Sequence, residues 1–266
     1  MEFEITLAKM PTYLTSEVNY LLRADNDFIK MNPLVGSTLK MKFLGQKFCA
    51  SCGNVFKDLF RMGFCKNCFF TKPEAGESII RPELSQAHEG KADRDLAFEQ
   101  AYQLQPHIVY LANSAGLKVG VTRQAQKLHR WMDQGASYAM VFAETSNRYE
   151  AGQIEVALKE FIGDKTPWQR MLKNEVPEVD LLEQKLALKE KLPSEWQAFV
   201  TQDEAVQALE YPVKEYPAKV KSINLDKEPE IEASLKGIKG QYLIFEGGRV
   251  INLRGHTGYR ISLSLA

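Results

Sequence analysis

Four cysteines, the only ones in the chain, form two Cys-x-x-Cys pairs: Cys49 with Cys52, and Cys65 with Cys68. Two such pairs with twelve residues between them have the spacing of a tetrahedral zinc site, in which four thiolates surround one ion. Zinc held by four cysteines has no open coordination position, so such an ion stabilises a fold instead of catalysing a reaction. The spacing therefore predicts a structural zinc ribbon, a kind of module that is frequent in proteins that contact nucleic acid.

Two disulfide bonds are the alternative use of the four cysteines. The opening residues, Met1-Glu2-Phe3-Glu4, are acidic and polar and do not predict a secretory signal peptide. We therefore expect a cytoplasmic protein, and disulfides are rare in a reducing cytosol. On this argument a metal is favoured over disulfides.

The charges are segregated along the chain, although the formal net charge is zero. Residues 40–72 contain seven basic residues and one acid, Asp58, and residues 105–132 contain four basic residues and no acid. Residues 174–232, in contrast, contain fourteen acids and seven bases. This segregation predicts a cationic face that attracts phosphates. The alternative is a solvated surface whose charges happen to cluster.

The length and composition are those of a globular protein with more than one module. The chain has 266 residues, of which 44% are hydrophobic, and two or three modules are expected at this size. No apolar run approaches the ~20 residues that span a bilayer, so we expect no membrane partner. The sequence does not indicate an oligomeric state.

Several further elements are predicted outside the cysteine pairs. Residues 72–91 are rich in Pro, Gly and Glu, which is typical of a linker or a wrapping loop. Gly247-Gly248 lies between two apolar runs and predicts a β-hairpin near the C-terminus. Apolar spacing predicts a strand at 38–44, helices at 93–104, 168–173 and 179–192, and extended chain at 211–232.

The most regular pattern lies between residues 108 and 163. The predicted elements are strands at 108–112 and 117–121, a helix at 124–134, a strand at 137–143 and a helix that begins after Asn147. Glu150, three residues after Asn147, completes a capping box. The order strand, strand, helix, strand, helix predicts a compact α/β unit of about 60 residues.

This unit resembles the GIY-YIG endonuclease superfamily, which has the same ββαβα order. Residues 108–110 (Ile-Val-Tyr) stand at the first family motif and residues 118–120 (Lys-Val-Gly) at the second, so that Ile and Lys replace the family's Gly and Tyr. Residues 129–131 (His-Arg-Trp) are similar to the Arg-aromatic step of the first helix. Residues 154–158 (Ile-Glu-Val-Ala-Leu) are similar to the Leu-Glu-x-x-Leu pattern of the second helix. The residues carried over are Tyr110, Gly120, Arg130 and Glu155.

The resemblance implies a metal-dependent nuclease site. Tyr110 would help to activate water, Arg130 would pair bidentately with the phosphate, and Lys118 would supply a charge where the family has Tyr. Glu155 would hold Mg²⁺ or Mn²⁺ through one carboxylate. The alternative for each residue is an ordinary structural role, which is packing for Tyr110 and solvation for the other three.

The whole chain also resembles a bacterial family of unassigned function. The shared features are the four-cysteine ribbon, the run Arg-Trp-Met-Asp-Gln-Gly-Ala at 130–136 and the run Asp-Lys-Thr-Pro-Trp at 164–168. This second resemblance implies no activity.

Together these patterns predict an α+β protein that binds nucleic acid, either DNA or RNA, and that cleaves it if the nuclease site is functional. The alternative is a non-catalytic nucleic-acid-binding or protein-interaction adaptor that uses the α/β unit as a recognition platform. The predicted segments are an N-terminal β-rich segment at 1–45, the zinc ribbon at 46–72, the GIY-YIG-like α/β unit at 93–165, a helical and extended acidic segment at 166–232, and a small C-terminal β element at 233–266.

Overall fold

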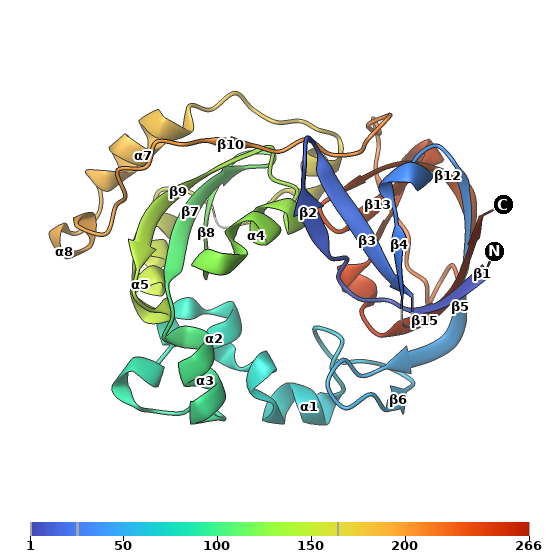
Figure 1. Ribbon diagram of the computed structural model, residues 1–266, viewed down its shortest axis with the longest axis horizontal. Helices are drawn as coiled ribbons and strands as arrows, with labels where there is room; N and C mark the ends of the chain where they lie inside the picture. Colours follow the sequence, from blue (N-terminus) through green and yellow to red (C-terminus); the bar gives the residue numbers. More distant parts are fainter. Residues whose placement is uncertain (1, 25–26, 164, 266) are drawn as a thin grey trace. The chain divides into compact units, whose positions relative to one another are not determined.

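The structure is a computed structural model that describes residues 2–24, 27–163 and 165–265. It is a mixed α+β protein, as predicted, and its chain divides into two compact units (Figure 1). The β unit comprises Met1–Phe70, Leu172–Asn174 and Glu210–Ala266, and the α/β unit comprises Thr71–Met171 and Glu175–Leu209. Asp164, which contributes to the second resemblance, lies outside the described residues.

The β unit is built on one large sheet. Its strands, in spatial order, are β1 (Glu2–Thr6), β15 (Tyr259–Leu265), β5 (Thr38–Phe48), β12 (Glu230–Lys239), β13 (Tyr242–Phe245), β14 (Arg249–Asn252) and β11 (Lys221–Ser222). Only the β11–β14 pairing is parallel, and β6 (Val55–Phe56) pairs with the end of β5. On β5, Leu39 and Met41 are buried whereas Lys40 and Lys42 face solvent, because successive side chains of a strand point to opposite faces.

A three-stranded sheet and several short turns complete the β unit. The sheet contains β2 (Thr12–Leu14), β3 (Val18–Ala24) and β4 (Asp27–Lys30), and the single-turn helices are η1 (Asn32–Leu34), η6 (Glu246–Gly248) and η7 (Arg254–His256). The predicted hairpin at Gly247-Gly248 is confirmed, because β13 and β14 pair in antiparallel fashion across it. Both glycines have positive φ, at 67° and 71°, which explains why glycine stands there.

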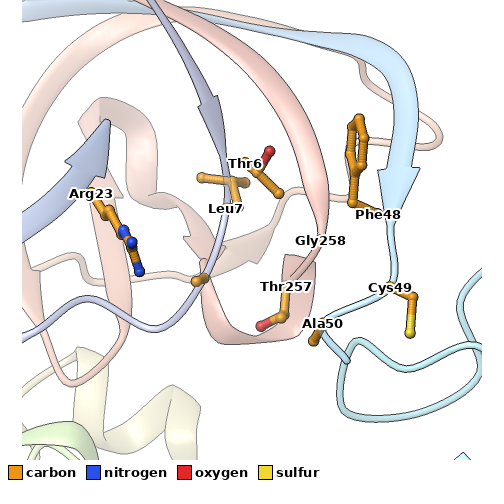
Figure 2. Close-up of a pocket in the computed structure, with 9 residues that line it drawn as sticks. Thr6, Leu7, Arg23, Phe48, Cys49, Ala50, Thr257 and Gly258 are labelled. Atoms are coloured by element: carbon orange, nitrogen blue, oxygen red, sulfur yellow. The ribbon is translucent and has the colours of Figure 1, made fainter. Parts of the chain in front are cut away.

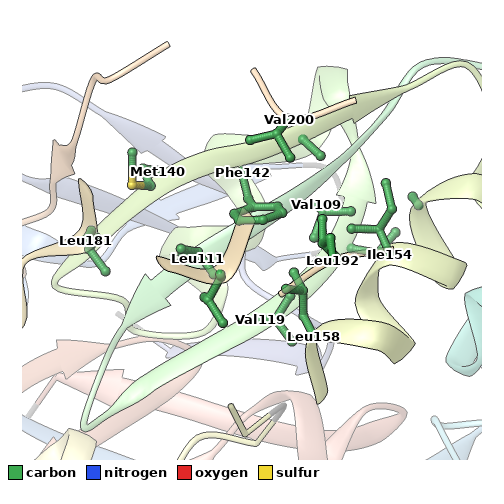
Figure 3. Close-up of a cluster of buried hydrophobic side chains, with 14 residues drawn as sticks. Val109, Leu111, Val119, Met140, Phe142, Ile154, Leu158, Leu181, Leu192 and Val200 are labelled. Atoms are coloured by element: carbon green, nitrogen blue, oxygen red, sulfur yellow. The ribbon is translucent and has the colours of Figure 1, made fainter. Parts of the chain in front are cut away.

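The α/β unit contains a four-stranded antiparallel sheet and shows the predicted order of strand, strand, helix, strand, helix. The elements in chain order are β7 (His107–Asn113), β8 (Leu117–Arg123), η5 (Gln124–Gln126), α4 (Lys127–Asp133), β9 (Tyr138–Thr145) and α5 (Arg148–Lys159), with β10 (Gln207–Ala208) at the sheet edge. Helix α7 (Leu181–Lys189) adds Leu181 and Leu188 to the apolar core. That core joins Leu111, Phe142 and Ile154 from the sheet and α5 (Figure 3).

The start of α5 has one half of the predicted capping box. Asn147 Oδ1 accepts a hydrogen bond from the Glu150 backbone N–H at 3.0 Å, which satisfies an N–H group that the first turn of a helix leaves without an intrahelical partner. The Glu150 carboxylate accepts a hydrogen bond from the Ser146 N–H, also at 3.0 Å, one residue before the Asn147 N–H that a capping box predicts.

Residues 72–91 differ from the predicted linker. They form η2 (Pro73–Ala75), α2 (Glu77–Ile80), η3 (Pro82–Leu84) and η4 (Ala87–Glu89), and α3 (Leu96–Gln103) follows. Arg148 of α5 donates to the carbonyl oxygens of Ser78 and Ile79, at 2.9 and 2.8 Å. A Cβ on Gly152 would lie 2.3 Å from the Glu83 nitrogen, so this glycine permits the close packing of η3 on α5. The Pro and Gly residues therefore lie at the ends of short packed helices.

The remaining helices are short. They are α1 (Lys66–Thr71), α6 (Trp168–Leu172) and α8 (Ser194–Gln197). Among the described residues, no helix has both the length and the apolar character required to cross a membrane.

Candidate functional site

The four cysteines meet in one place. Their Sγ atoms all lie within 4.8 Å of one another, and each thiol is free of disulfide bonding. A zinc ion with bonds of about 2.3 Å to four sulfurs places those sulfurs about 3.8 Å apart, so the cluster needs little adjustment to hold one. Cys49, Cys65 and Cys68 are buried, whereas Cys52 is exposed. Four soft thiolate donors this close together fit zinc.

The two pairs are positioned by different local structures. Cys49 and Cys52 lie on the turn between β5 and β6, where Gly53 has a φ of 71° and donates to the Cys49 carbonyl at 2.9 Å. Cys65 immediately precedes α1, and Cys68 lies in its first turn. The tight turn that a ribbon predicts is present at residues 61–64, just before Cys65. Because α1 begins between the two cysteines, the second pair is held by a turn together with the start of a helix.

Backbone N–H groups point at the sulfurs. The Cys65 N–H donates to Cys49 Sγ at 3.2 Å, and the Cys68 N–H donates to Cys65 Sγ at 3.4 Å. Burial tends to raise the pKa of Cys49, but N–H donors from Cys52, Cys65 and Ser51 lower it to about 6. Burial and the neighbouring thiols raise the pKa of Cys68 to about 12. The two pKa values thus shift in opposite directions, so ionisation of one thiol disfavours ionisation of the next. A divalent cation would stabilise all four thiolates together.

A polar network adjoins this cluster within the β unit. Lys47, two residues before Cys49, contacts Asp226 at 2.7 Å and Asp58 at 3.1 Å, and its ammonium lies 4.8 Å from the Tyr259 ring centre. Burial tends to lower the pKa of Lys47, but these partners raise it well above its usual value. The network joins the segment that carries the cysteines to the strands of the sheet.

A cavity of about 320 Å³ borders Cys49 within the β unit (Figure 2). Arg23 is its one charged lining residue, and Thr6 and Thr257 add hydroxyl groups. The cavity is lined by β-unit residues alone and contains none of the predicted nuclease residues.

In the α/β unit, two of the predicted residues share one hydrogen-bond acceptor. Tyr110 Oη and Lys118 Nζ both donate to Gln134 Oε1, each at 2.7 Å, and Lys118 also donates to Thr166 Oγ1 at 2.6 Å. Tyr110 is fully buried and Lys118 is 2% exposed. We call Tyr110, Lys118, Arg130, Gln134 and Thr166 the Gln134 cluster.

Gly120 and Arg130 shape the surroundings of the tyrosine. Gly120 pairs with Tyr110 across β7 and β8, and a Cβ on Gly120 would lie 2.5 Å from Tyr110 Oη. Burial raises the pKa of Tyr110, and the charge of the adjacent Arg130 guanidinium opposes that rise. Among the described residues, Arg130 Nε has no hydrogen-bond partner although it is buried. Glycine is therefore required at position 120 by the tyrosine ring that lies against it.

Glu155 projects from α5 and is 7% exposed. Burial raises its pKa, whereas Lys159, whose Nζ lies 3.4 Å from Glu155 Oε2, lowers it. The charge of Glu83 on η3 raises it further, and the charge of Glu155 in turn acts on Tyr110. Thus Tyr110, Lys118 and Arg130 come together, whereas Glu155 interacts with the tyrosine only through its charge.

Several polar residues near these groups were not predicted. Gln134 and Thr166 are brought to Lys118 from 16 and 48 residues away. Both lie in the runs at 130–136 and 164–168 that resemble the bacterial family, but nothing in those runs marks them as partners of Lys118. His107 is fully buried, and burial lowers its pKa to about 4.

The predicted cationic face is smaller than the sequence indicates. In residues 105–132, Lys118 lies in the Gln134 cluster instead of on the surface. On β5, Lys40 pairs with Glu232 at 3.3 Å and Lys42 pairs with Glu230 at 2.6 Å. The acidic segment therefore neutralises part of the basic one across neighbouring strands.

The fold and the cysteine cluster define a mixed α+β protein whose clustered thiols could hold a metal ion. The chain belongs to the family described as "Protein of unknown function (DUF2797)", whose model matches residues 36–261. The match spans both the cysteines and the Gln134 cluster, and it confirms the prediction of a family without an assigned activity. The chain matches no curated protein, and no solved structure matches it either.

Proposed function

We propose that the protein is a zinc-containing nucleic-acid-binding protein whose α/β unit is GIY-YIG-like and hydrolyses phosphodiesters. The observation that carries the proposal is the convergence of Tyr110 and Lys118 on Gln134, with Arg130 beside Tyr110 and Gly120 making room for the tyrosine. Short sequence motifs alone do not require these side chains to meet.

The chemistry assigns each group a task. Arg130 carries a fixed positive charge and a buried Nε that makes no hydrogen bond to described residues, so it suits a non-bridging phosphate oxygen. Lys118 adds a second charge nearby. Glu155 would hold Mg²⁺ or Mn²⁺, which would neutralise charge on the phosphate as water attacks phosphorus and the leaving oxygen departs.

The zinc has a structural role in this proposal. Cys49, Cys52, Cys65 and Cys68 would occupy all four positions of a tetrahedral ion and leave none for substrate. The ion would fix the backbone of residues 49–70 by joining the β5–β6 turn to the first turn of α1.

Cleavage by the full-length, zinc-loaded protein tests the catalytic part. Labelled DNA and RNA are incubated with Mg²⁺ or Mn²⁺, and we expect products from the wild type and none from Glu155→Gln. Glu150→Gln is the matched control, because this residue lies on the same helix and glutamine also serves in a capping box. Failure of the wild type to cleave, or equal cleavage by Glu155→Gln, overturns the enzymatic proposal.

A non-catalytic role is the second candidate, and the burial of Tyr110 and Lys118 favours it. Tyr110 is fully buried, and its hydroxyl already donates a hydrogen bond to Gln134. Water therefore reaches the tyrosine oxygen only after a rearrangement. A recognition platform would show salt-sensitive binding without cleavage, weakened by Lys118→Ala or Arg130→Ala. A protein-interaction adaptor would show no affinity for nucleic acid.

A further inference from the structure

Three phenylalanines of residues 49–70, which we call the cysteine module, form a cluster on its surface. The ring centres of Phe60 and Phe69 are 5.0 Å apart, those of Phe60 and Phe70 are 5.5 Å apart, and those of Phe69 and Phe70 are 5.3 Å apart. Phe60 is 46% exposed, Phe70 is 56% exposed and the neighbouring Met62 is 41% exposed. We call these four residues the aromatic patch. Grouped exposed aromatic side chains mark binding surfaces more often than scattered ones do.

The aromatic patch lies on a small framework of fixed geometry. Its rings come from the loop before Cys65 and from α1, which Cys68 ties to the sulfur cluster. Phe64, next to Cys65 in the sequence, is buried at 8% exposure, in contrast to the exposed Phe60 and Phe70. Rings held in this way lose little conformational freedom when a planar ligand stacks on them.

The rim of the aromatic patch is cationic. Lys57, Arg61 and Lys66 are exposed, and the Arg61 guanidinium carbon lies 5.6 Å from the Phe60 ring centre. Asp58, the one acid of residues 40–72, is engaged by the buried Lys47 at 3.1 Å. Lys47 also pairs with Asp226, so it compensates the charge of Asp58 only in part. Against this one acid, Lys57, Arg61 and Lys66 give the rim an excess of positive charge.

We infer that the aromatic patch binds unpaired nucleotides of a single-stranded nucleic acid. Bases would stack on Phe60 and Phe70 while phosphates contact Lys57, Arg61 and Lys66, which is the pairing of aromatic platform and cationic groove that single strands require. A duplex hides the faces of its bases, and an acidic peptide has few planar groups to stack. The inference rests on the nucleic-acid partner of the proposed function but not on cleavage.

Fluorescence anisotropy with the full-length, zinc-loaded protein tests this inference. The probes are a labelled 20-nucleotide DNA strand of mixed sequence, the RNA equivalent and the matching duplex. We expect tighter binding of the strands than of the duplex, and a roughly tenfold loss for Phe60→Ala or Phe70→Ala. Phe28→Ala is the matched control, because Phe28 is 50% exposed on β4 in the same unit and lies outside the aromatic patch.

A second pair of variants separates stacking from stability. Phe60→Leu and Phe70→Leu keep apolar bulk but remove the aromatic face, and we expect them to retain zinc and lose most of the strand binding. Glu155→Gln should bind strands with wild-type affinity although it does not cleave them. A failure of the cleavage proposal is therefore distinguishable from a failure of strand binding by the aromatic patch. Wild-type strand affinity in both leucine variants, an equal loss in Phe28→Ala, or no strand binding by the wild type overturns the inference. Binding to phosphatidylserine vesicles in place of strands overturns it in favour of a lipid surface.

Discussion

The cysteine module and the α/β unit differ in how many apolar side chains they bury. The module buries three cysteines and Phe64 while Phe60 and Phe70 face solvent. The α/β unit instead closes a core of fourteen buried apolar side chains between its sheet and helices (Figure 3). A short segment with so little apolar burial needs another source of stability, and four converging thiols supply a site for one. From this comparison we expect the stability of the module to depend on a bound ion and that of the α/β unit to depend on packing.

Removing the metal should have the largest effect, and it should be confined to the module. Chelation, or Cys65→Ser at a buried ligand position, removes an interaction worth on the order of 10 kcal/mol in zinc-finger peptides. We expect amides of residues 49–70 to lose hydrogen-exchange protection while amides of β7 and β8 keep theirs.

The control is Ala50→Ser, an exposed position that lies between Cys49 and Cys52 and leaves all four sulfurs and their hydrogen-bond donors in place. This variant should retain zinc and protection. Unchanged exchange of residues 49–70 after complete metal removal would contradict the dependence on an ion.

A cavity in the α/β core should give the complementary result. Phe142 is fully buried in the apolar core, and Phe142→Ala should lower the free energy of unfolding by about 3–5 kcal/mol. Zinc content should stay at the wild-type value, because the core and the cysteines belong to different units. Urea denaturation measures the free energy of unfolding, and metal analysis of the same samples measures zinc content. Zinc loss in proportion to the destabilisation would contradict the claim that the core and the cysteine cluster are stabilised independently.

His107 should make the α/β unit sensitive to acid. Burial lowers its pKa from 6.5 to about 4, and the charges of Arg148 and Arg123 act in the same direction. Below pH 6.5 the unfolded chain binds a proton that the folded unit does not, so stability is lost as pH falls from 6.5 toward 4. Between pH 7 and 4.5 the wild type should lose about 2 kcal/mol more than His107→Gln. Equal losses in denaturation experiments at the two pH values would refute this assignment.

The smallest effect is expected for the tyrosine hydroxyl. Tyr110→Phe removes one hydrogen bond to Gln134, but Lys118 still satisfies that oxygen, so the cost should be about 1 kcal/mol. Cleavage, if Tyr110 helps to activate water, should fall far more than this small change in stability explains. A variant that loses stability and keeps full cleavage would assign Tyr110 a packing role.

The sequence predicted features that depend on near neighbours. The cysteine pairs, the Gly247-Gly248 hairpin and the Asn147 cap are each set by a few consecutive residues, and the structure contains all three. The helix that begins after Cys65 and carries Cys68 was missed, because ligand spacing alone does not distinguish a turn from the first turn of a helix.

Contacts between residues far apart in the sequence could not be predicted from local patterns. Lys47 meets Asp226, and Lys118 meets Thr166, through contacts that only the folded sheets create. For the same reason the basic stretches predicted a cationic face, although Lys42 pairs with Glu230 on a neighbouring strand. Charge counted along a sequence does not reveal which charges become partners.

X-ray absorption at the zinc edge of the purified full-length protein tests the central claim most directly. The cysteine cluster predicts one zinc ion per chain with four sulfur neighbours at about 2.3 Å. Absence of zinc, or a first coordination sphere dominated by nitrogen and oxygen, would contradict it.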